Sequence, residues 1–290
     1  MRTSEAVVAF LGTGLMGAPM ALRLHHQGYR VIAWNRSPEK LPPLVAAGVA
    51  TADTPAAALV DATLIVLMLS DAGAIRETLL TPPALSGLAG RTVLQMGTIA
   101  PQESQAVAQA VAAAGGSYLE APVLGSIPQA KSGELILMVG ATPEQLDRWR
   151  PLLECFGPEP QLMGPVGAGS GVKLAMNQLI GTLTAAFSMS LGLVQQQGID
   201  VEKFMGIVRQ SALYAPTFDK KLQRMCDRNF DNPNFPTKHL LKDMRLFIQA
   251  TAGLDARVAQ AVAELAEGAV ADGLADQDYS AIFAAVQPES

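Results

Sequence analysis

The sequence predicts an α/β protein of two domains, residues 1–165 and 166–290, with the second domain all-helical. Up to about residue 165, strand-like and helix-like runs alternate, as in the βαβ units that build a parallel sheet. After the segment GPVGAGSG at 164–171 the strand-like runs stop, and stretches rich in Ala, Leu and Gln continue to the C-terminus. A length of 290 residues, 49% of them hydrophobic, exceeds what one core usually holds and favours two domains.

The individual elements follow from apolar periodicity and from the residues that end each run. Met16, Met20 and Leu24 share helical spacing in a segment that Gly28 ends, and Pro101 suits the first position of another helix. The expected helices are 15–27, 38–47 and 101–114. The expected strands are 7–11, 29–34, 62–69, 92–96, 117–121 and 135–140.

Charge and cysteine content exclude several classes of protein. The net charge is -5 and the chain has no run of Lys or Arg, so no nucleic-acid partner is expected. The 2 cysteines, Cys155 and Cys226, lie far apart and outside metal-binding spacings, so no disulfide or metal site is expected and a reducing, cytoplasmic location fits best. The N-terminus enters a strand too early for a signal peptide, so we expect the mature chain to start here.

Residues 174–194 carry no charge over about the length of a membrane span, so a membrane helix is conceivable. Asn177, Gln178 and several Thr and Ser residues interrupt the segment, and aromatic or basic belts are missing at its ends. We therefore predict no membrane partner but a helix buried on most sides at a domain or subunit interface, and a homo-oligomer, either a dimer or a tetramer.

A glycine-rich loop follows the first predicted strand directly and opens the first predicted helix. Its sequence, GTGLMG, matches GxGxxG. Gly12 permits the tight turn, Gly14 lets the backbone approach a pyrophosphate, and Gly17 lets helix and strand pack closely. The alternative is an ordinary glycine-rich turn, but the position of the motif between a strand and a helix favours a Rossmann-type dinucleotide-binding domain. The expected cofactor contacts in the loop are Gly12, Thr13, Gly14, Leu15, Met16 and Gly17.

The end of the second predicted strand indicates which dinucleotide binds. An NAD site usually has an acidic residue about 20 residues after the loop. Here residues 18–38 contain no Asp or Glu, and the first acidic residue is Glu39. Asn35, Arg36 and Ser37 occupy that end instead, and a guanidinium there suits a 2′-phosphate. We therefore predict NADPH/NADP as the cofactor, the alternative being that Arg36 is a solvated surface cation.

Lys173 and Asn177 lie four residues apart near the start of the uncharged helix, which places them on one helical face. A lysine facing the cofactor at a domain boundary could donate a proton to a carbonyl oxygen as hydride arrives. It could equally pack its stem and reach water, and spacing alone leaves both possibilities open. His239 lacks an obvious carboxylate partner and is not favoured as catalytic.

Four segments together, FLGTGLMGAPMA (10–21), APVLGSIPQAKSGELILMVG (121–140), GSGVKLAMNQ (169–178) and KHLLKDMRL (238–246), resemble the β-hydroxyacid dehydrogenase family, which includes 3-hydroxyisobutyrate dehydrogenase. Within it, WNRSPEK, MLSD at 68–71 and DQDYSAIFAAV at 276–286 look most like the NADPH-dependent glyoxylate/succinic semialdehyde reductases. The resemblance implies a Rossmann domain followed by an all-α domain, with the active site in a cleft between them.

The resemblance also implies roles for single residues. Lys173 matches the catalytic lysine and Asn177 a neighbouring substrate residue, while Thr98 matches a contact to both cofactor and substrate. The implied cofactor contacts are Met68, Leu69, Ser70 and Lys242, and the implied substrate residues are Leu124, Gly125, Ser126, Phe235 and Asp243. The backbone amides of 124–126 would hold a substrate carboxylate.

Two departures from the family pattern stand out. Leu124 replaces the usual serine of the substrate loop, so one side-chain hydrogen bond to substrate is absent. Gln95 and Gly97 replace the usual acidic and serine pair before Thr98.

The expected activity is NADPH-dependent reduction of small aldehyde acids, glyoxylate or succinic semialdehyde, to glycolate or 4-hydroxybutyrate, with Lys173 as proton donor. One alternative is oxidation of 3-hydroxyisobutyrate or another β-hydroxyacid by the same residues. An alternative of another class is a non-catalytic NADPH-binding module.

Overall fold

The computed structural model describes residues 6–288, and within it the chain forms two compact units that divide between Lys173 and Leu174. The first unit has a mixed sheet with helices on both faces, and the second is helical. This arrangement confirms the predicted fold class. The predicted domain boundary near residue 165 stays a prediction, since the long helix α8 (Ala168–Gln196) runs past it.

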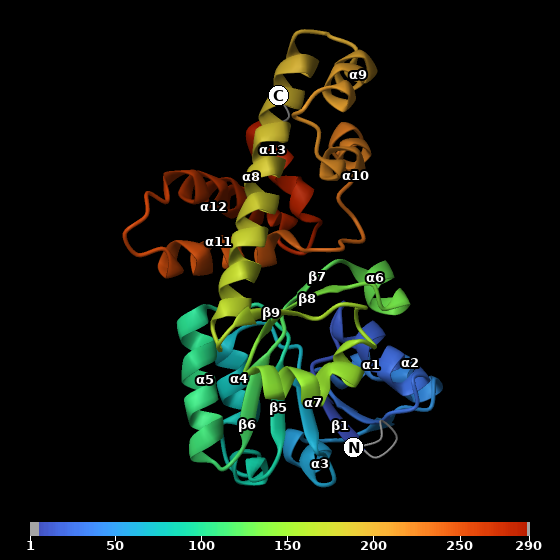
Figure 1. Ribbon diagram of the computed structural model, residues 1–290. Helices are drawn as coiled ribbons and strands as arrows, with labels where there is room; N and C mark the ends of the chain where they lie inside the picture. The colour runs from blue at the N-terminus through green and yellow to red at the C-terminus, as the bar shows by residue number, and fades with distance from the viewer. Residues whose placement is uncertain (1–5, 289–290) are drawn as a thin grey trace. The chain divides into compact units, whose positions relative to one another are not determined.

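The sheet of the first unit has the strand order of a dinucleotide-binding fold (Figure 1). Its six parallel strands follow the order β3-β2-β1-β4-β5-β6, so the order reverses between β1 and β4. Strand β8 then pairs antiparallel with β6, and β7 and β9 both pair with β8. The strands are β1 Val7–Leu11, β2 Arg30–Trp34, β3 Ala50–Thr51, β4 Leu64–Leu67, β5 Thr92–Gln95, β6 Ser117–Glu120, β7 Val123–Leu124, β8 Ile136–Gly140 and β9 Gln161–Gly164.

Two hydrophobic cores cover the two faces of this sheet, because successive side chains of a strand point to opposite faces. On β1, Val8 and Phe10 pack with α1, α2, α6 and α7, whereas Ala9 and Leu11 pack with α3, α4 and α5. The helices are α1 Gly17–His26, α2 Pro42–Ala46, α3 Pro55–Leu59, α4 Ala72–Leu79, α5 Pro101–Ala113, α6 Ile127–Ser132 and α7 Pro143–Leu153. Both faces are therefore covered, as parallel sheets require.

The predicted strands and the two longer predicted helices of this unit are confirmed, with shifts of at most two residues at their ends. The predicted helix 38–47 is wrong as one helix, because it consists of a 3-10 turn (Pro38–Lys40) and α2. Pro42 and Pro43 have no N–H to continue a helix through Leu41, and each restricts the residue before it. Strands β3, β7 and β9 were not predicted, since two to four residues at a sheet edge carry little periodicity.

The second unit packs its helices around two hydrophobic cores. One core joins α8, α11 and α12 through residues such as Ala185, Met244 and Val262, and the other joins α8, α9 and α10 through residues such as Phe187, Met205 and Phe218. The helices after α8 are α9 Val201–Gln210, α10 Pro216–Cys226, α11 Thr237–Ala250, α12 Arg257–Ala269 and α13 Ile282–Val286, with a turn at Val270–Leu274 and a 3-10 turn at Tyr279–Ala281 between the last two.

Within residues 174–194, which were predicted to be buried on most sides at a domain or subunit interface, α8 leaves one face exposed. Leu179, Met189 and Leu193 are each at least half exposed, with exposed fractions of 50%, 64% and 59%. The absence of charged residues from a segment does not determine which of its side chains are exposed to water. Exposed apolar stripes of this kind are frequent at contacts between proteins. Within residues 6–288, no helix has the combined length and hydropathy that a membrane crossing needs.

A buried ion pair ties together distant segments of the second unit. The Lys221 ammonium lies 2.8 Å and 2.9 Å from the two Asp278 carboxylate oxygens, and it stands 4.3 Å from the centre of the Tyr279 ring. Asp278 also accepts hydrogen bonds from the backbone N–H and the hydroxyl of Ser280. Burial lowers the pKa of Lys221, and the attraction of Asp278 opposes this only in part.

Replacing Lys221 by methionine (K221M) should lower the free energy of unfolding by about 3 kcal/mol. Methionine keeps most of the packing but leaves the Asp278 carboxylate buried without its cation. The matched control is R30M, which breaks the exposed Arg30–Asp61 pair and should change stability by less than about 1 kcal/mol. Urea unfolding of both variants measures the difference. Equal losses in the free energy of unfolding would contradict the larger contribution expected of the buried Lys221–Asp278 pair.

Candidate cofactor and active site

The glycine loop between β1 and α1 is shaped by close backbone contacts. Gly12 has φ +99°, and a Cβ there would overlap the carbonyl oxygen of Met68. A Cβ on Gly17 would overlap the carbonyl oxygen of Gly12, so helix α1 can come this close to the loop only because residue 17 is glycine. A Cβ on Gly14, in contrast, would meet no atom within 4 Å. The first and third glycines are thus required by the fold, while the second faces open space.

This open space fits the phosphates of a dinucleotide. Helix α1 begins without a side-chain cap and without an acidic residue in its first turn, which leaves N–H groups and a partial positive charge for an anion. The hydroxyl of Thr13 is buried and has no hydrogen-bond partner among the described residues. Thr13 and the first turn of α1 would therefore hold a pyrophosphate.

Asn35 connects the glycine loop to the end of β2. Its side-chain oxygen accepts a hydrogen bond from the Thr13 N–H at 2.9 Å, and its amide nitrogen donates to the Ser37 carbonyl at 3.0 Å. The Gly12 N–H donates to the Trp34 carbonyl at 2.9 Å. Asn35 therefore acts first as a brace that fixes the loop beside Arg36 and Ser37.

A hollow of about 170 Å³ lies at the carboxyl ends of β1, β2 and β4. This is where ligands bind in open α/β sheets, at the point where the strand order reverses. Eight of the predicted cofactor residues line it: Gly12, Gly14, Asn35, Arg36, Ser37, Met68, Leu69 and Ser70. Thr13, Leu15, Met16, Gly17 and Thr98 are not among its lining residues, and Lys242 belongs to the second unit.

Sequence reasoning missed four lining residues, Trp34, Lys40, Ala74 and Thr78. Lys40 matters most, because it adds a second cation to the hollow that Arg36 also lines. It ends the 3-10 turn after β2, four residues beyond Arg36. The signal was the second positive charge in WNRSPEK, which the prediction of a regular helix at 38–47 placed outside the site.

The segment after β5, which carries Thr98, is shaped by Gln95. The Gln95 side chain accepts from the Gly97 N–H and donates to the Gly97 carbonyl, both at 3.2 Å. A Cβ on Gly97 would lie 2.6 Å from the Leu69 carbonyl oxygen. The departure Gln95–Gly97 from the family pattern thus forms a closed local brace that leads into Thr98.

The predicted substrate loop follows β7. Gly125 has φ +140°, a conformation that favours glycine, and Ser126 caps α6. The N–H and the hydroxyl of Ser126 both donate to the Gln129 side-chain oxygen, at 3.1 Å and 2.7 Å. One of the backbone amides expected for a substrate carboxylate, that of Ser126, is therefore engaged within the loop. Leu124, half-buried, pairs with Ile136 across the hairpin.

Lys173 and Asn177 lie on α8, and Lys242 and Asp243 lie on α11. Lys173 is half-buried in the second turn of α8, and Asn177 is buried four residues further on. In the second unit, Asn177 donates a 2.6 Å hydrogen bond to the Asp243 carboxylate, whose other oxygen lies 3.0 Å from the Lys242 ammonium. The buried Asn177 and Asp243 and the half-buried Lys242 thus form one polar cluster, although the resemblance implies a cofactor contact for Lys242 and substrate contacts for the other two.

Phe235 lies near this cluster in sequence and stacks on His239 with 6.4 Å between ring centres. It also contacts the Tyr279 ring at 5.6 Å. Burial and the nearby Lys242 lower the pKa of His239, which keeps its imidazole neutral near pH 7.

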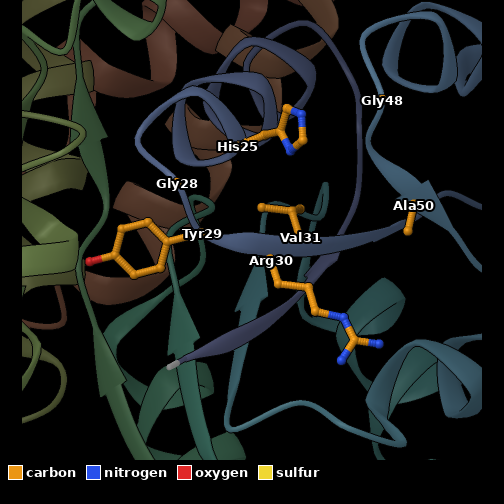
Figure 2. A pocket seen from close by; sticks show the side chains of 7 residues that line it. All are labelled: His25, Gly28, Tyr29, Arg30, Val31, Gly48 and Ala50. Atoms are coloured by element: carbon orange, nitrogen blue, oxygen red, sulfur yellow. The ribbon is translucent and has the colours of Figure 1, made fainter. Parts of the chain in front are cut away.

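A second hollow of about 280 Å³ lies at the amino ends of β2 and β3 (Figure 2). Its polar side chains do not converge: the Arg30 guanidinium points away from His25 and pairs with Asp61, and the Tyr29 ring turns to the other side. A ligand site needs polar groups aimed at a common point. We therefore assign it no role.

Comparison with known families gives a match to each half of the chain. The sequence model for the NAD-binding domain of 6-phosphogluconate dehydrogenase matches residues 7–164. The model for the NAD-binding region of NADP-dependent 3-hydroxyisobutyrate dehydrogenase matches residues 167–286. Both halves thus point to dinucleotide-dependent dehydrogenases.

Individual relatives agree with the family models. The chain is 31% identical over 284 residues to glyoxylate/succinic semialdehyde reductase 2 of Arabidopsis thaliana, covering 97% of this chain and 79% of that protein. Identity to reductase 1 of the same plant is 30%, covering 97% and 98%. The solved 3-hydroxyisobutyrate dehydrogenase of Mycobacterium tuberculosis has the same fold, with a TM-score of 0.86 and 24% identity over 97% of this chain and 99% of that one. The chain therefore belongs to the β-hydroxyacid dehydrogenase family and is an NAD(P)-dependent oxidoreductase of hydroxyl and carbonyl groups.

Proposed function

We propose that this enzyme uses NADPH to reduce small aldehyde acids, glyoxylate or succinic semialdehyde, to the corresponding hydroxyacids. The observation that carries the cofactor preference is the charge of the hollow beside the glycine loop. Arg36 and Lys40 both line it, and none of the described residues that line it carries a carboxylate. A 2′-phosphate would gain two cations there, whereas the ribose 2′-OH of NAD would find no acidic acceptor.

The substrate class is supported by the two plant reductases, whose names state that they act on glyoxylate and succinic semialdehyde. Each aldehyde acid has a carbonyl carbon that accepts hydride and a carboxylate that orients the molecule. NADPH supplies the hydride when bound. The substrate roles of Thr98, Gly125, Ser126, Asn177, Phe235 and Asp243 stay predictions.

Lys173 is the proton donor in this proposal. An ammonium beside the carbonyl oxygen stabilises the negative charge that develops there as the carbon is reduced, and it then transfers its proton to give the hydroxyl group. Its half-buried position on α8 limits the water that competes for this hydrogen bond. Asn177, on the same helix, would orient the substrate by a hydrogen bond.

The variants R36A and K40A test the cofactor preference. Each should lower kcat/KM for NADPH about ten- to a hundredfold and leave the value for NADH nearly unchanged, because charge-assisted hydrogen bonds to the 2′-phosphate are lost. R30A removes an exposed cation from the same strand and should change neither value. Equal losses with both cofactors would show that Arg36 and Lys40 do not bind the 2′-phosphate.

The variant K173M tests the proton donor. It should lower kcat about 10²- to 10⁴-fold, the usual contribution of a positioned acid, while the Kd for NADPH measured by fluorescence changes little. K203M removes an exposed lysine of α9 and serves as the control, with unchanged kcat expected. Near wild-type turnover by K173M would remove Lys173 from the mechanism.

The variant L124S tests whether the substrate loop selects among aldehyde acids. A serine hydroxyl would add a hydrogen bond to the substrate carboxylate, whereas leucine favours a longer apolar chain by about 0.8 kcal/mol per buried CH₂. We expect the ratio of kcat/KM for glyoxylate to that for succinic semialdehyde to rise about tenfold. I136S, on the paired strand, should leave this ratio unchanged. An unchanged ratio in L124S would show that Leu124 does not contact the methylene chain of succinic semialdehyde.

A further inference from the structure

Helix α8, which carries Lys173, begins with a sequence that is poorly suited to a helix start. Its first residues are Ala168, Gly169, Ser170 and Gly171, preceded by Gly167. Glycine destabilises a helix by roughly 0.5–1 kcal/mol relative to alanine, and Gly167 has no side chain to cap the free N–H groups. Some other part of the chain has to hold this first turn.

Glu120, the last residue of β6, supplies the missing cap. One carboxylate oxygen accepts the N–H groups of Gly167 and Ser170, both at 2.9 Å. The other oxygen accepts the Ser170 hydroxyl at 2.7 Å and the Ser104 hydroxyl at a shorter distance. The Glu120 side chain is fully buried. Four donors therefore converge on one buried carboxylate, as a buried charge requires.

The network behind Glu120 has a defined direction. Ser104 has a single hydroxyl proton and donates it to Glu120, so the 2.8 Å contact between Ser104 and Tyr118 must be a hydrogen bond donated by Tyr118. Burial raises the pKa of Tyr118, which keeps this phenol protonated and able to donate. The carboxylate is therefore held from α5 and β6 as well as from α8.

Two glycines make room for this arrangement. A Cβ on Gly140, in β8, would overlap the Glu120 carboxylate, and a Cβ on Gly169 would overlap the Met138 carbonyl oxygen. The first turn of α8 is thus pressed against β6 and β8 with little freedom to shift. The GAGSG sequence that weakens the helix start is what permits this close approach.

We propose that Glu120 is a positioning residue for catalysis, because it fixes the first turn of α8, directly before the turn that carries Lys173. Lys173 lies three residues after Ser170, about 4.5 Å further along the helix axis. A shift of about 1 Å in a catalytic group can cost about a hundredfold in rate. This inference rests on the proposed role of Lys173, but the capping of α8 by Glu120 does not.

The test compares E120Q, E120D and S170A in the full-length enzyme. E120Q keeps the shape but turns one acceptor into a donor, so it should lower kcat about ten- to a hundredfold. E120D keeps the carboxylate and should retain more activity than E120Q, and S170A, which removes one of four hydrogen bonds, should lose only a few-fold. The Kd for NADPH should change less than twofold in all three, since none of these residues lines the cofactor hollow.

The matched control is T92V, which breaks the partly buried hydrogen bond between Thr92 and Ser117 at the opposite end of β5 and β6. It should lower stability and leave kcat unchanged. Hydrogen exchange of the segment 166–176 gives a readout independent of activity, and it should be faster in E120Q and S170A but not in T92V. If E120Q folds and keeps the wild-type kcat, the proposal is overturned. If E120Q does not fold, a wild-type kcat in S170A overturns it.

Failure of the proposed function is distinguishable from failure of this inference. If the wild-type enzyme reduced none of the aldehyde acids with NADPH, the substrate assignment would fail. The exchange comparison would still decide whether Glu120 holds the start of α8, and unchanged exchange in E120Q would overturn it.

Discussion

The unpaired N–H groups at a helix N-terminus are the constraint on which the first unit of this enzyme depends. Helices α1 and α8 each begin after a strand of the sheet and at a glycine-rich segment. Neither supplies a capping side chain of its own, so the donors of each first turn must be satisfied from outside the helix. The fold solves this problem in two opposite ways.

At α1 the donors are left open. This helix start suits an anionic ligand, because its first turn has no acid, Gly14 faces open space, and the buried Thr13 hydroxyl has no hydrogen-bond partner within residues 6–288. At α8 the donors are closed by Glu120, and an anion would find a carboxylate in its place. The start of α1 therefore has donors available for a ligand, whereas the start of α8, ahead of Lys173, is held by hydrogen bonds within the protein.

The buried charged side chains of this protein each have a defined local partner. The chain has few charged residues, and several buried ones serve defined local purposes: Glu120 caps a helix, Lys221 and Asp278 join distant segments, and Asp243 holds the Asn177 amide. The exposed cations Arg36 and Lys40 face the cofactor hollow instead. The low content of charged residues thus accompanies a large apolar core and an exposed apolar face on α8.

The order of strands and helices, the glycine loop and the basic end of β2 could be read from local patterns, because each depends on residues close together in sequence. Lys173 and Asn177 were marked by spacing and by family resemblance. The contacts that hold distant segments together could not be found in this way: Glu120 meets Gly167 across 47 positions, and Lys221 meets Asp278 across 57. Lys40 was missed for a subtler reason, since proline breaks the expected helix and leaves it in a 3-10 turn beside the hollow.

The sequence by itself determined the fold class and predicted the place of the dinucleotide and the sign of the charge that would receive it, because periodicity, glycine spacing and side-chain type are local properties. Only the tertiary structure decided that Gly12 and Gly17 are required by backbone contacts, that Ser126 spends its donors on Gln129, and that the start of α8 is capped from β6. Those features are hydrogen bonds and close approaches between segments far apart in the chain, and they exist only once the sheet and its helices have packed.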